Sequence, residues 1–434
     1  MEYFGRFMRN ILCLKVVNRE ILVRPQWLIR SNEFSTGFKA RVPSDLSNND
    51  FPYTPVIAFV NTRSGGQSGE KVSRELLRRL NPRQVFLLKN NETIVDALQI
   101  YSSLPNVHVC VFGGDGTVGW VLGCLAEAYP NGNNPPVSIC PLGTGNDLSR
   151  VLSWGEQYDP QRLMQTLLQI PTAQTVVLDR WQVQLEQLDS SEVVSSAPPS
   201  CQSGTAIDQI FQLLFNDPKF ARESNRLVYE NYQKLPNTRF INYMSFGLDA
   251  AVALEFHHQR TLYPEKFSSP LKNKLMYLNE SGKYFNDFAR ANIWDLTSYI
   301  RLICDGQDLT NRLENCHSLI VLNIPGYAAG TDPWRNSLSE GSINFFESLS
   351  NRETSFDRQN FGDQIIEVVG LSTAHMAAIH MGLAGNRIAQ CRQLRLELSS
   401  PITAQIDGEP FYLPTSIAIN ISHAGQVRVS KNDN

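Results

Sequence analysis

The sequence predicts an α/β fold, with a parallel sheet and helical crossovers in an N-terminal domain and a second domain built mainly on β-sheet. Two observations carry this prediction. In the first half of the chain, short apolar runs end in glycine-rich turns that lead into helical patterns, which is the rhythm of parallel strands joined by crossover helices. From about residue 180 onward, apolar and polar residues alternate, as they do in half-buried antiparallel strands.

Length and composition limit the class of protein. With 434 residues, 42% of them hydrophobic and 19% charged, the chain is long enough for two globular domains. A net charge of −3 argues against nucleic acid as a partner, and no apolar run approaches the roughly 20 residues of a membrane-spanning helix. The eight cysteines include no Cys-x-x-Cys pair, which argues against a zinc ribbon and favours a reducing, cytoplasmic compartment.

Residues 1–54 are predicted to form an N-terminal arm and linker. Within residues 1–41, eight basic residues stand against three acidic ones. Apolar residues at helical spacing lie among them between positions 4 and 12. This pattern fits either an amphipathic helix on an anionic membrane surface or an arm packed on the following domain. The stretch from 41 to 53, rich in Pro, Ser, Asn and Asp, is typical of a linker.

The first domain is predicted to span residues 55–180. Its strands are continuously apolar, as expected for strands buried on both faces of a parallel sheet. Helical patterns follow two of these strands. In chain order, the expected elements are a strand at 56–60, a helix at 70–80, strands at 85–88 and 107–112, a helix at 117–128 and a strand at 137–140.

The second domain is predicted to span residues 181–425. It opens with an alternating strand at 181–186, and the Ser-, Pro- and Gly-rich segment 187–205 is expected to be a mobile loop. The other expected elements are strands at 319–324, 364–370, 394–398 and 416–421, and helices at 250–258 and 374–382.

Three glycine-rich turns, at 61–66, 113–119 and 141–147, follow strands of the expected parallel sheet. The carboxyl ends of parallel strands lie at one edge of a sheet, so the three turns are expected to face the same crevice. Glycine lets backbone N–H groups approach phosphate groups closely, and turn hydroxyls can donate to the same groups. The sequence therefore favours a site for a nucleoside triphosphate.

A dinucleotide enzyme is the alternative for this site. Gly114, Gly116 and Gly119 form the GxGxxG pattern of nicotinamide- and flavin-binding proteins. Two features weigh against it. The following strand ends at Cys140 without the acidic residue that binds a ribose, and Asp115 places a carboxylate in the turn, where it would repel a pyrophosphate. The lysine-containing phosphate loop GxxxxGK[ST] is also missing.

These turns, together with longer motifs, resemble the diacylglycerol kinase family. The Gly-Gly-Asp-Gly turn at 113–116 is shared more widely, with sphingosine, ceramide and NAD kinases. The run Thr-Val-Gly-Trp-Val-Leu at 117–122 is more discriminating, and the resemblance extends from about residue 55 to about 425. The compact form is similar to plant and protist enzymes without cysteine-rich lipid modules. The other matching segments are PLGTGNDLSR at 141–150, YMSFGLDA at 243–250, LEFH at 254–257, PEKF at 264–267, IPGYAAGTDPW at 324–334 and EVVGL at 367–371.

The resemblance implies a Rossmann-like nucleotide-binding domain and a β-sandwich domain, with ATP in a cleft between them and the chain end returning to the first domain. The implied activity is phosphorylation of diacylglycerol by ATP and Mg²⁺, giving phosphatidic acid, by an enzyme peripherally associated with a membrane surface. The alternatives are a sphingoid-base or ceramide kinase and a catalytically silent sensor of lipid or nucleotide. The implied nucleotide-binding residues are Asn61, Ser64, Gly65, Gly66, Gly113, Gly114, Asp115, Gly116, Thr117, Gly143, Thr144, Gly145 and Asn146.

Phosphoryl transfer to an alcohol needs a carboxylate near the attacking hydroxyl. By the resemblance, Glu409 is the proton acceptor and Asp407 lies beside it to orient substrate or metal. Asp115 is the rival catalytic carboxylate. From the residues alone, Asp-Gly-Glu-Pro at 407–410 predicts a β-turn between strands, and the two interpretations are compatible.

Three further polar positions complete the predictions. Asp363 and the carbonyl of Ile365 match a structural Mg²⁺ site of bacterial relatives, although Gln364 stands where glycine is usual and reaches turn angles only with strain. Asp249 is either a polar anchor or a turn residue at a strand end. The histidine pair at 257–258 has no metal-ligand spacing, and His257 is predicted to be structural.

Overall fold

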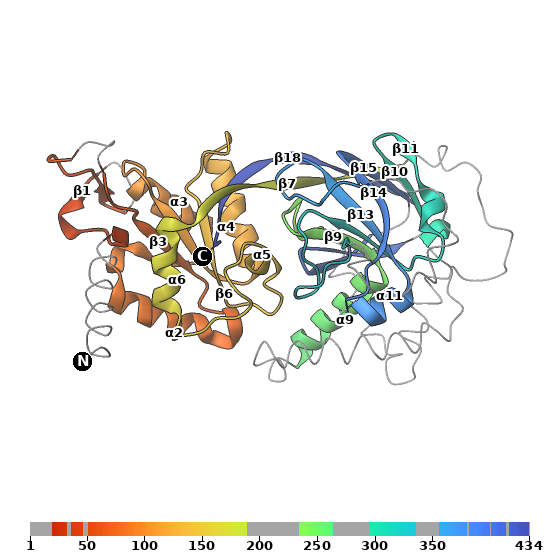
Figure 1. The fold of residues 1–434 in the computed structure, drawn as a ribbon, viewed down its shortest axis with the longest axis horizontal. Helices are drawn as coiled ribbons and strands as arrows, with labels where there is room; N and C mark the ends of the chain where they lie inside the picture. Colours follow the sequence, from red (N-terminus) through yellow and green to blue (C-terminus); the bar gives the residue numbers. More distant parts are fainter. Residues whose placement is uncertain are drawn as a thin grey trace. The chain divides into compact units, whose positions relative to one another are not determined.

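The chain folds into two compact units, seen in a computed structural model (Figure 1). Unit 1 comprises Met1–Leu178 and Gln426–Asn434, and unit 2 comprises Asp179–Gly425. The chain therefore passes between the units twice, once within strand β7 (Gln174–Gln187) and once within strand β18 (Ile417–Lys431). The structure describes residues 20–32, 36–46, 51–188, 234–263, 296–335, 356–379, 382–399, 401–413 and 416–433.

The sheet of unit 1 is parallel, in the order β18, β6, β5, β3, β4. Every residue of β3 and β6 is buried, because helices cover both faces of a sheet of this kind. The last residues of β18 join this sheet through Val429, which pairs with Val137. The strands preceding β18 in this sheet are β3 (Val56–Val60), β4 (Val85–Leu87), β5 (His108–Gly113) and β6 (Val137–Pro141).

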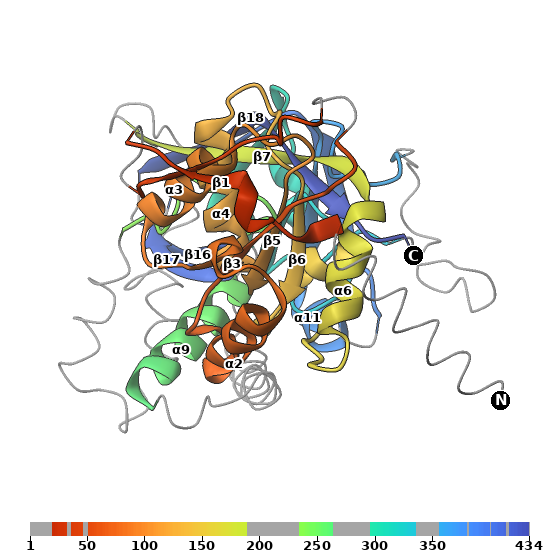
Figure 2. The ribbon, with the colours of Figure 1, turned by 90° about the vertical axis from the view of Figure 1, so that its left-hand side faces the viewer.

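Crossover helices connect the parallel strands of unit 1, and Figure 2 shows them around the sheet. Helix α2 packs on β3, β4 and β5, and α4 packs on β5 through an apolar face. The helix predicted at 70–80 begins earlier than expected, at Ser64, inside the first glycine turn. The helices are α2 (Ser64–Arg79), α3 (Asn91–Tyr101), α4 (Asp115–Ala128), α5 (Asp147–Val151) and α6 (Leu163–Gln169), with 3₁₀ turns at Pro25–Trp27, Pro82–Gln84 and Ile170–Thr172.

The described part of the N-terminal arm packs on the rest of unit 1. The buried side chain of Gln84 accepts a hydrogen bond from the Val23 N–H at 2.8 Å and donates to the carbonyls of Ile21, at 2.9 Å, and Val56, at 2.7 Å. The arm also forms a small hairpin of β1 (Leu28–Arg30) and β2 (Phe38–Ala40). The apolar stretch at 4–12 and the predicted loop beyond residue 188 lie outside the described residues.

Unit 2 contains two antiparallel sheets. One has the order β14, β13, β12, β9, β16, β17, and the other joins β11, β10, β15 and the first part of β18, with β7 pairing β18 and β8. The predicted α/β fold class, with a parallel sheet and antiparallel sheets, is confirmed. The strands are β8 (Arg239–Phe240), β9 (Tyr243–Gly247), β10 (Ile300–Cys304), β11 (Gln307–Asp308), β12 (Ser318–Leu322), β13 (Ile366–Leu371), β14 (Asn386–Cys391), β15 (Gln393–Leu398), β16 (Ile402–Ile406) and β17 (Glu409–Leu413).

The core of unit 2 lies between these sheets. Phe246 and Val368 enter it from one sheet, and Leu396 and Ile419 from the other. Alternate residues of β15 are buried, which is the period-two pattern of a strand with one face on a core. Helix α9 (Leu248–Leu262) packs on β9, β16 and β17; α11 (Thr373–Ala378) and 3₁₀ turns at Leu296–Ser298 and Thr310–Leu313 complete the unit.

Two element predictions in unit 2 need correction. The strand expected at 416–421 continues to Lys431, because pairing with β6 extends it through a Ser-His-Ala-Gly-Gln stretch that has no strong strand pattern. The helix expected at 374–382 is seen as α11, which ends at Ala378, and residues 380–381 of the expected helix lie outside the described residues.

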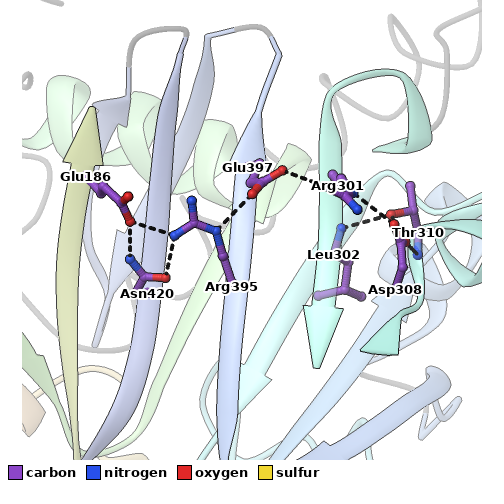
Figure 3. A network of polar contacts seen from close by, with 8 residues as sticks. All are labelled: Glu186, Arg301, Leu302, Asp308, Thr310, Arg395, Glu397 and Asn420. Carbon is purple, nitrogen blue, oxygen red and sulfur yellow. Dashed lines mark hydrogen bonds and ion pairs between the residues drawn. The ribbon is translucent and has the colours of Figure 1, made fainter. Parts of the chain in front are cut away.

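The outer face of the second sheet of unit 2 carries a ladder of charged side chains, drawn in Figure 3. Arg395 binds Glu186 at 2.6 Å and Glu397 at 2.9 Å, and Arg301 binds Glu397 at 3.1 Å and Asp308 at 2.8 Å. The hydrogen bond from Thr310, followed by that from Arg301, lowers the pKa of Asp308 to about 2. Asn420 of β18 donates to Glu186 and accepts from Arg395, so the ladder links five neighbouring strands through side chains as well as backbone.

Candidate active site

The three glycine turns of unit 1 lie together at the carboxyl edge of its parallel sheet. Strands β3, β5 and β6 are neighbours, so their following turns share that edge. A Cβ atom at Gly114 would lie 2.9 Å from the Cα of Gly143, and one at Gly65 would lie 2.6 Å from the carbonyl oxygen of Leu142. Only glycine allows these backbones to approach so closely. The structure therefore brings the three predicted turns into contact.

A side-chain link joins the first two turns. The Asn61 amide donates to the hydroxyl oxygen of Thr117 at 2.9 Å, and the Asn61 side-chain oxygen accepts from the Arg63 N–H at 3.0 Å. Thr117 is buried and presses against Gly113, where a Cβ atom would lie 2.5 Å from it. The Thr117 hydroxyl accepts from Asn61 and keeps its own hydrogen to donate.

Asp115 joins the second turn to the third. Its two carboxylate oxygens accept hydrogen bonds from the backbone N–H groups of Asp147, at 3.0 Å, and Leu148, at 3.1 Å. Asp115 is also the first residue of α4. A carboxylate that accepts from the first N–H groups of a helix stabilises its N-terminus, here that of α5. These contacts give Asp115 an architectural role, while its predicted catalytic role remains a prediction.

Asn146 closes the third turn. It adopts a left-handed backbone conformation, with φ of 54°. Its side-chain oxygen accepts from the Gly143 N–H at 2.9 Å, and its amide donates at 2.8 Å to the carbonyls of Gly143 and Glu156. Arg150 donates to the carbonyl of Gly145 at 3.1 Å. Thr144 is left exposed at the tip of this ordered turn.

Two helices begin at the turns. Helix α2 starts in the first turn and α4 in the second, and neither has a side-chain N-cap within the described residues. The N–H groups of a helix N-terminus and its positive dipole end attract anions. Around Gly116, in the first turn of α4, no atom of the described residues outside the helix's own backbone and the neighbouring residues lies within 4 Å of the position that a Cβ would take. This edge of unit 1 is therefore suited to binding a phosphate chain.

In unit 2, Asp407 and Gly408 form a two-residue hairpin turn between β16 and β17. Both have positive φ, 47° and 84°, as in a type I′ turn. The Asp407 carboxylate accepts from the N–H groups of Ile241, Asn242 and Tyr243 at 3.1, 2.9 and 3.0 Å. The turn interpretation is confirmed, and Asp407 anchors the backbone that leads into β9.

Glu409 is the first residue of β17, directly after this turn, and its side chain is 53% exposed. The Nε2 atom of His257, on α9, lies 3.1 Å from its carboxylate. Partial burial would raise the pKa of Glu409, but the hydrogen bond and charge of His257, with the charge of Arg260, lower the pKa below its ordinary value. Glu409 is therefore ionised at neutral pH. The sequence analysis did not predict this contact between His257 and Glu409, because 152 positions separate the two residues along the chain.

Asp363 forms a tight turn with its own neighbours. Its carboxylate accepts from the Ile365 N–H at 3.0 Å, and Gln364 has φ of 64°, the strained angle expected where glycine is usual. Burial raises the pKa of Asp363. In the part of the chain that the structure describes, no three His, Cys, Asp or Glu side chains are grouped as metal ligands. A structural Mg²⁺ at Asp363 and Ile365 remains a prediction.

Asp249 is a buried polar anchor at the start of α9. Its carboxylate accepts hydrogen bonds from Ser245, from Tyr327 at 2.8 Å and from Gln405 at 2.8 Å. Its own N–H donates to the Ser318 hydroxyl at 3.0 Å. Burial raises the pKa of Asp249. The network ties the N-terminus of α9 to three neighbouring strands and to the loop at Tyr327.

Comparisons with known proteins assign the two units to one class, a kinase catalytic domain with its accessory domain. The diacylglycerol kinase catalytic domain matches residues 55–178, and the diacylglycerol kinase accessory domain matches residues 239–410. The chain belongs to the diacylglycerol kinase family.

Several relatives are similar over most of this chain. Diacylglycerol kinase iota of Homo sapiens is 37% identical over 381 residues, 87% of this chain and 31% of that protein. Diacylglycerol kinase zeta of Homo sapiens is 36% identical over 83% of this chain and 34% of its own length. A solved diacylglycerol kinase from Bacillus anthracis is 13% identical, covering 88% of this chain and 97% of that one, with a TM-score of 0.44. The chain thus spans about a third of the length of the iota and zeta relatives.

None of the helices within the described ranges has the length and hydropathy needed to cross a membrane.

Proposed function

We propose that this chain transfers the γ-phosphoryl group of MgATP to the free hydroxyl of a 1,2-diacylglycerol, giving phosphatidic acid and ADP. One observation carries the proposal: three glycine turns meet at one edge of the unit 1 sheet, where two helices begin without a side-chain cap from any described residue. Family membership supports the choice of acceptor.

Unit 1 binds the nucleotide in this proposal. Backbone N–H groups of the three turns surround the triphosphate, and the hydroxyls of Ser64, Thr117 and Thr144 donate to it. Mg²⁺ arrives with the nucleotide as part of the substrate and neutralises phosphate charge. The contacts of Asn61, Asp115 and Asn146 support this role, because they hold the turns in place before the nucleotide binds.

Glu409 accepts the proton of the attacking alcohol. The hydroxyl oxygen forms a bond to the γ-phosphorus, the bond from that phosphorus to the bridging oxygen of ADP breaks, and the hydroxyl proton passes to the Glu409 carboxylate. The lowered pKa and the exposed position of Glu409 support the assignment, since a proton acceptor must be ionised and reachable.

The test is a lipid panel with the purified full chain, labelled ATP and Mg²⁺ in mixed micelles. We expect labelled phosphatidate, and no product from sphingoid bases or ceramide. Glu409→Gln should reduce turnover to a small residual rate and spare ATP binding, whereas Gly114→Asp should abolish both; Glu314→Gln, at an exposed carboxylate elsewhere in unit 2, is the control. Product from ceramide instead would favour the ceramide kinase alternative. Absence of both ATP binding and product would favour the silent sensor.

We also propose that the reaction takes place at a cytoplasmic membrane surface, with the chain bound peripherally. Support comes from the lipid substrate and from the excess of basic residues within 1–41. Vesicle flotation tests this proposal. Removing residues 1–19, which stops short of the buried contacts of Ile21 and Val23 with Gln84, should weaken binding to anionic vesicles more than it lowers activity on a short-chain substrate; an equal loss of both would show that the segment is structural.

A further inference from the structure

We propose that His257 is a positioning residue that holds the carboxylate of Glu409 in the orientation needed to accept the substrate proton. This inference rests on the proposed function of Glu409 and adds a residue to its machinery. The observation behind it is the 3.1 Å approach of the His257 Nε2 atom to the Glu409 carboxylate.

The two partners differ in how firmly they are held. Glu409 follows a two-residue turn, and its side chain is 53% exposed, so by itself it would sample several rotamers. The His257 side chain is 19% exposed and lies on α9, a 15-residue helix packed on β16 and β17. The buried network around Asp249 fixes the first turn of that helix. Helix α9 is therefore a rigid support that holds the His257 imidazole beside the exposed Glu409 side chain.

Arg260 approaches the same nitrogen. Its guanidinium lies 2.6 Å from the His257 Nε2 atom, one helical turn along α9. That nitrogen either accepts from Arg260 or donates to Glu409, but it cannot do both. Because the Arg260 side chain is exposed, it can turn into solvent at little cost while His257 donates to Glu409. The donating state of His257 is the one that positions the carboxylate.

A proton acceptor must lie within hydrogen-bond reach of the hydroxyl that it serves, so a freely rotating Glu409 would act in only a fraction of encounters. Loss of the His257 contact should therefore lower kcat and leave the KM for MgATP unchanged. We expect a loss of about 10- to 100-fold in kcat.

The experiment compares three single variants of the full chain in the lipid kinase assay, with thermal unfolding measured for each. His257→Leu removes the contact and should show the full loss of kcat. His257→Gln places an amide N–H near the position of Nε2 and should recover most of it. His258→Leu, at the neighbouring position of the same helix, is the matched control and should remain near wild type.

A double variant distinguishes loss of the Glu409 contact from a general disruption of the fold. In a Glu409→Gln background, His257→Leu should cause no further loss, because the contact has nothing left to position. Wild-type kcat in His257→Leu, equal loss in the leucine and glutamine variants, or a further loss in the double variant would overturn the inference. In each case an active wild type and a Glu409→Gln variant with only residual turnover would leave the proposed function standing. A wild type that phosphorylates no lipid would overturn both proposals.

Discussion

Replacing Gly143 by alanine should disrupt ATP binding while the chain remains folded. A Cβ atom at this position would lie 2.6 Å from the Cα of Gly114 and 2.8 Å from the side-chain oxygen of Asn146. Ordinary contacts begin at 3.4 Å, so the second and third turns must separate by about 0.8 Å. A shift near 1 Å in groups that position a reactant lowers the reaction rate on the order of 100-fold. We expect the same shift to weaken the hydrogen bonds from these turns to the phosphates. We expect ATP affinity to fall by about 10- to 100-fold.

Calorimetric titration with MgATP measures this effect, and thermal unfolding confirms that the variant is folded. Gly123→Ala is the matched control, because Gly123 lies inside α4 and no described residue beyond the surrounding helix comes within 4 Å of the place that an alanine methyl group would occupy. That substitution should stabilise the chain by about 0.5–1 kcal/mol and keep ATP affinity unchanged. Wild-type affinity in Gly143→Ala would refute the idea that the tight approach of these turns shapes the phosphate site.

Three further predictions concern stability. Asp407→Ala leaves three backbone N–H groups without their acceptor and should lower the free energy of unfolding by about 1.5–3 kcal/mol in a denaturant titration; an unchanged midpoint would contradict its anchoring role. Burial raises the pKa of Glu367 from an ordinary 4.5 to about 8, so the folded state holds a proton that the unfolded state releases, and stability should fall between these pH values by up to about 1.4 kcal/mol per pH unit. Glu367→Gln should flatten that decline when unfolding is compared at pH 5 and pH 8, and an identical slope in both proteins would count against it. Arg395→Met removes the central cation of the charged ladder and should lower the free energy of unfolding by less than about 1 kcal/mol, and by less at high salt. A decrease that does not depend on salt would indicate lost packing instead.

Strands β3 to β6 and helices α2 and α4 of unit 1 were predictable because their signals are local, whereas α3, α5 and α6 were not predicted. An apolar run, a glycine turn and a helical pattern follow one another within about 25 residues, and the strand predicted at 56–60 matches β3. The strands of unit 2 were harder, since β9 was not predicted and pairs with β12 and β16, far along the chain. The long course of β18 depends on partners in both units, which no local pattern records.

In the candidate site, too, the locally encoded features were predictable and the long-range contacts were not. Glycine spacing predicted the three turns, and turn chemistry predicted the hairpin at Asp407. The contacts that fix them could not be predicted, because Asp115 meets the N-terminus of α5 and His257 meets Glu409 only after the chain has folded. The sequence shows Asp115 and His257 themselves, but it does not show which residues they contact. The catalytic and nucleotide-binding roles of these residues remain predictions.

Because the end of β18 belongs to unit 1, this unit is not formed by one contiguous stretch of the chain. A fragment ending at Leu178 would lack the strand beside β6 and would leave the indole N–H of Trp154, which donates to the Ser430 carbonyl at 2.5 Å, without that acceptor. Asn134 would likewise lose both of its hydrogen bonds to the backbone of Arg428. During synthesis, unit 1 must therefore wait until β18 has left the ribosome before its sheet is complete.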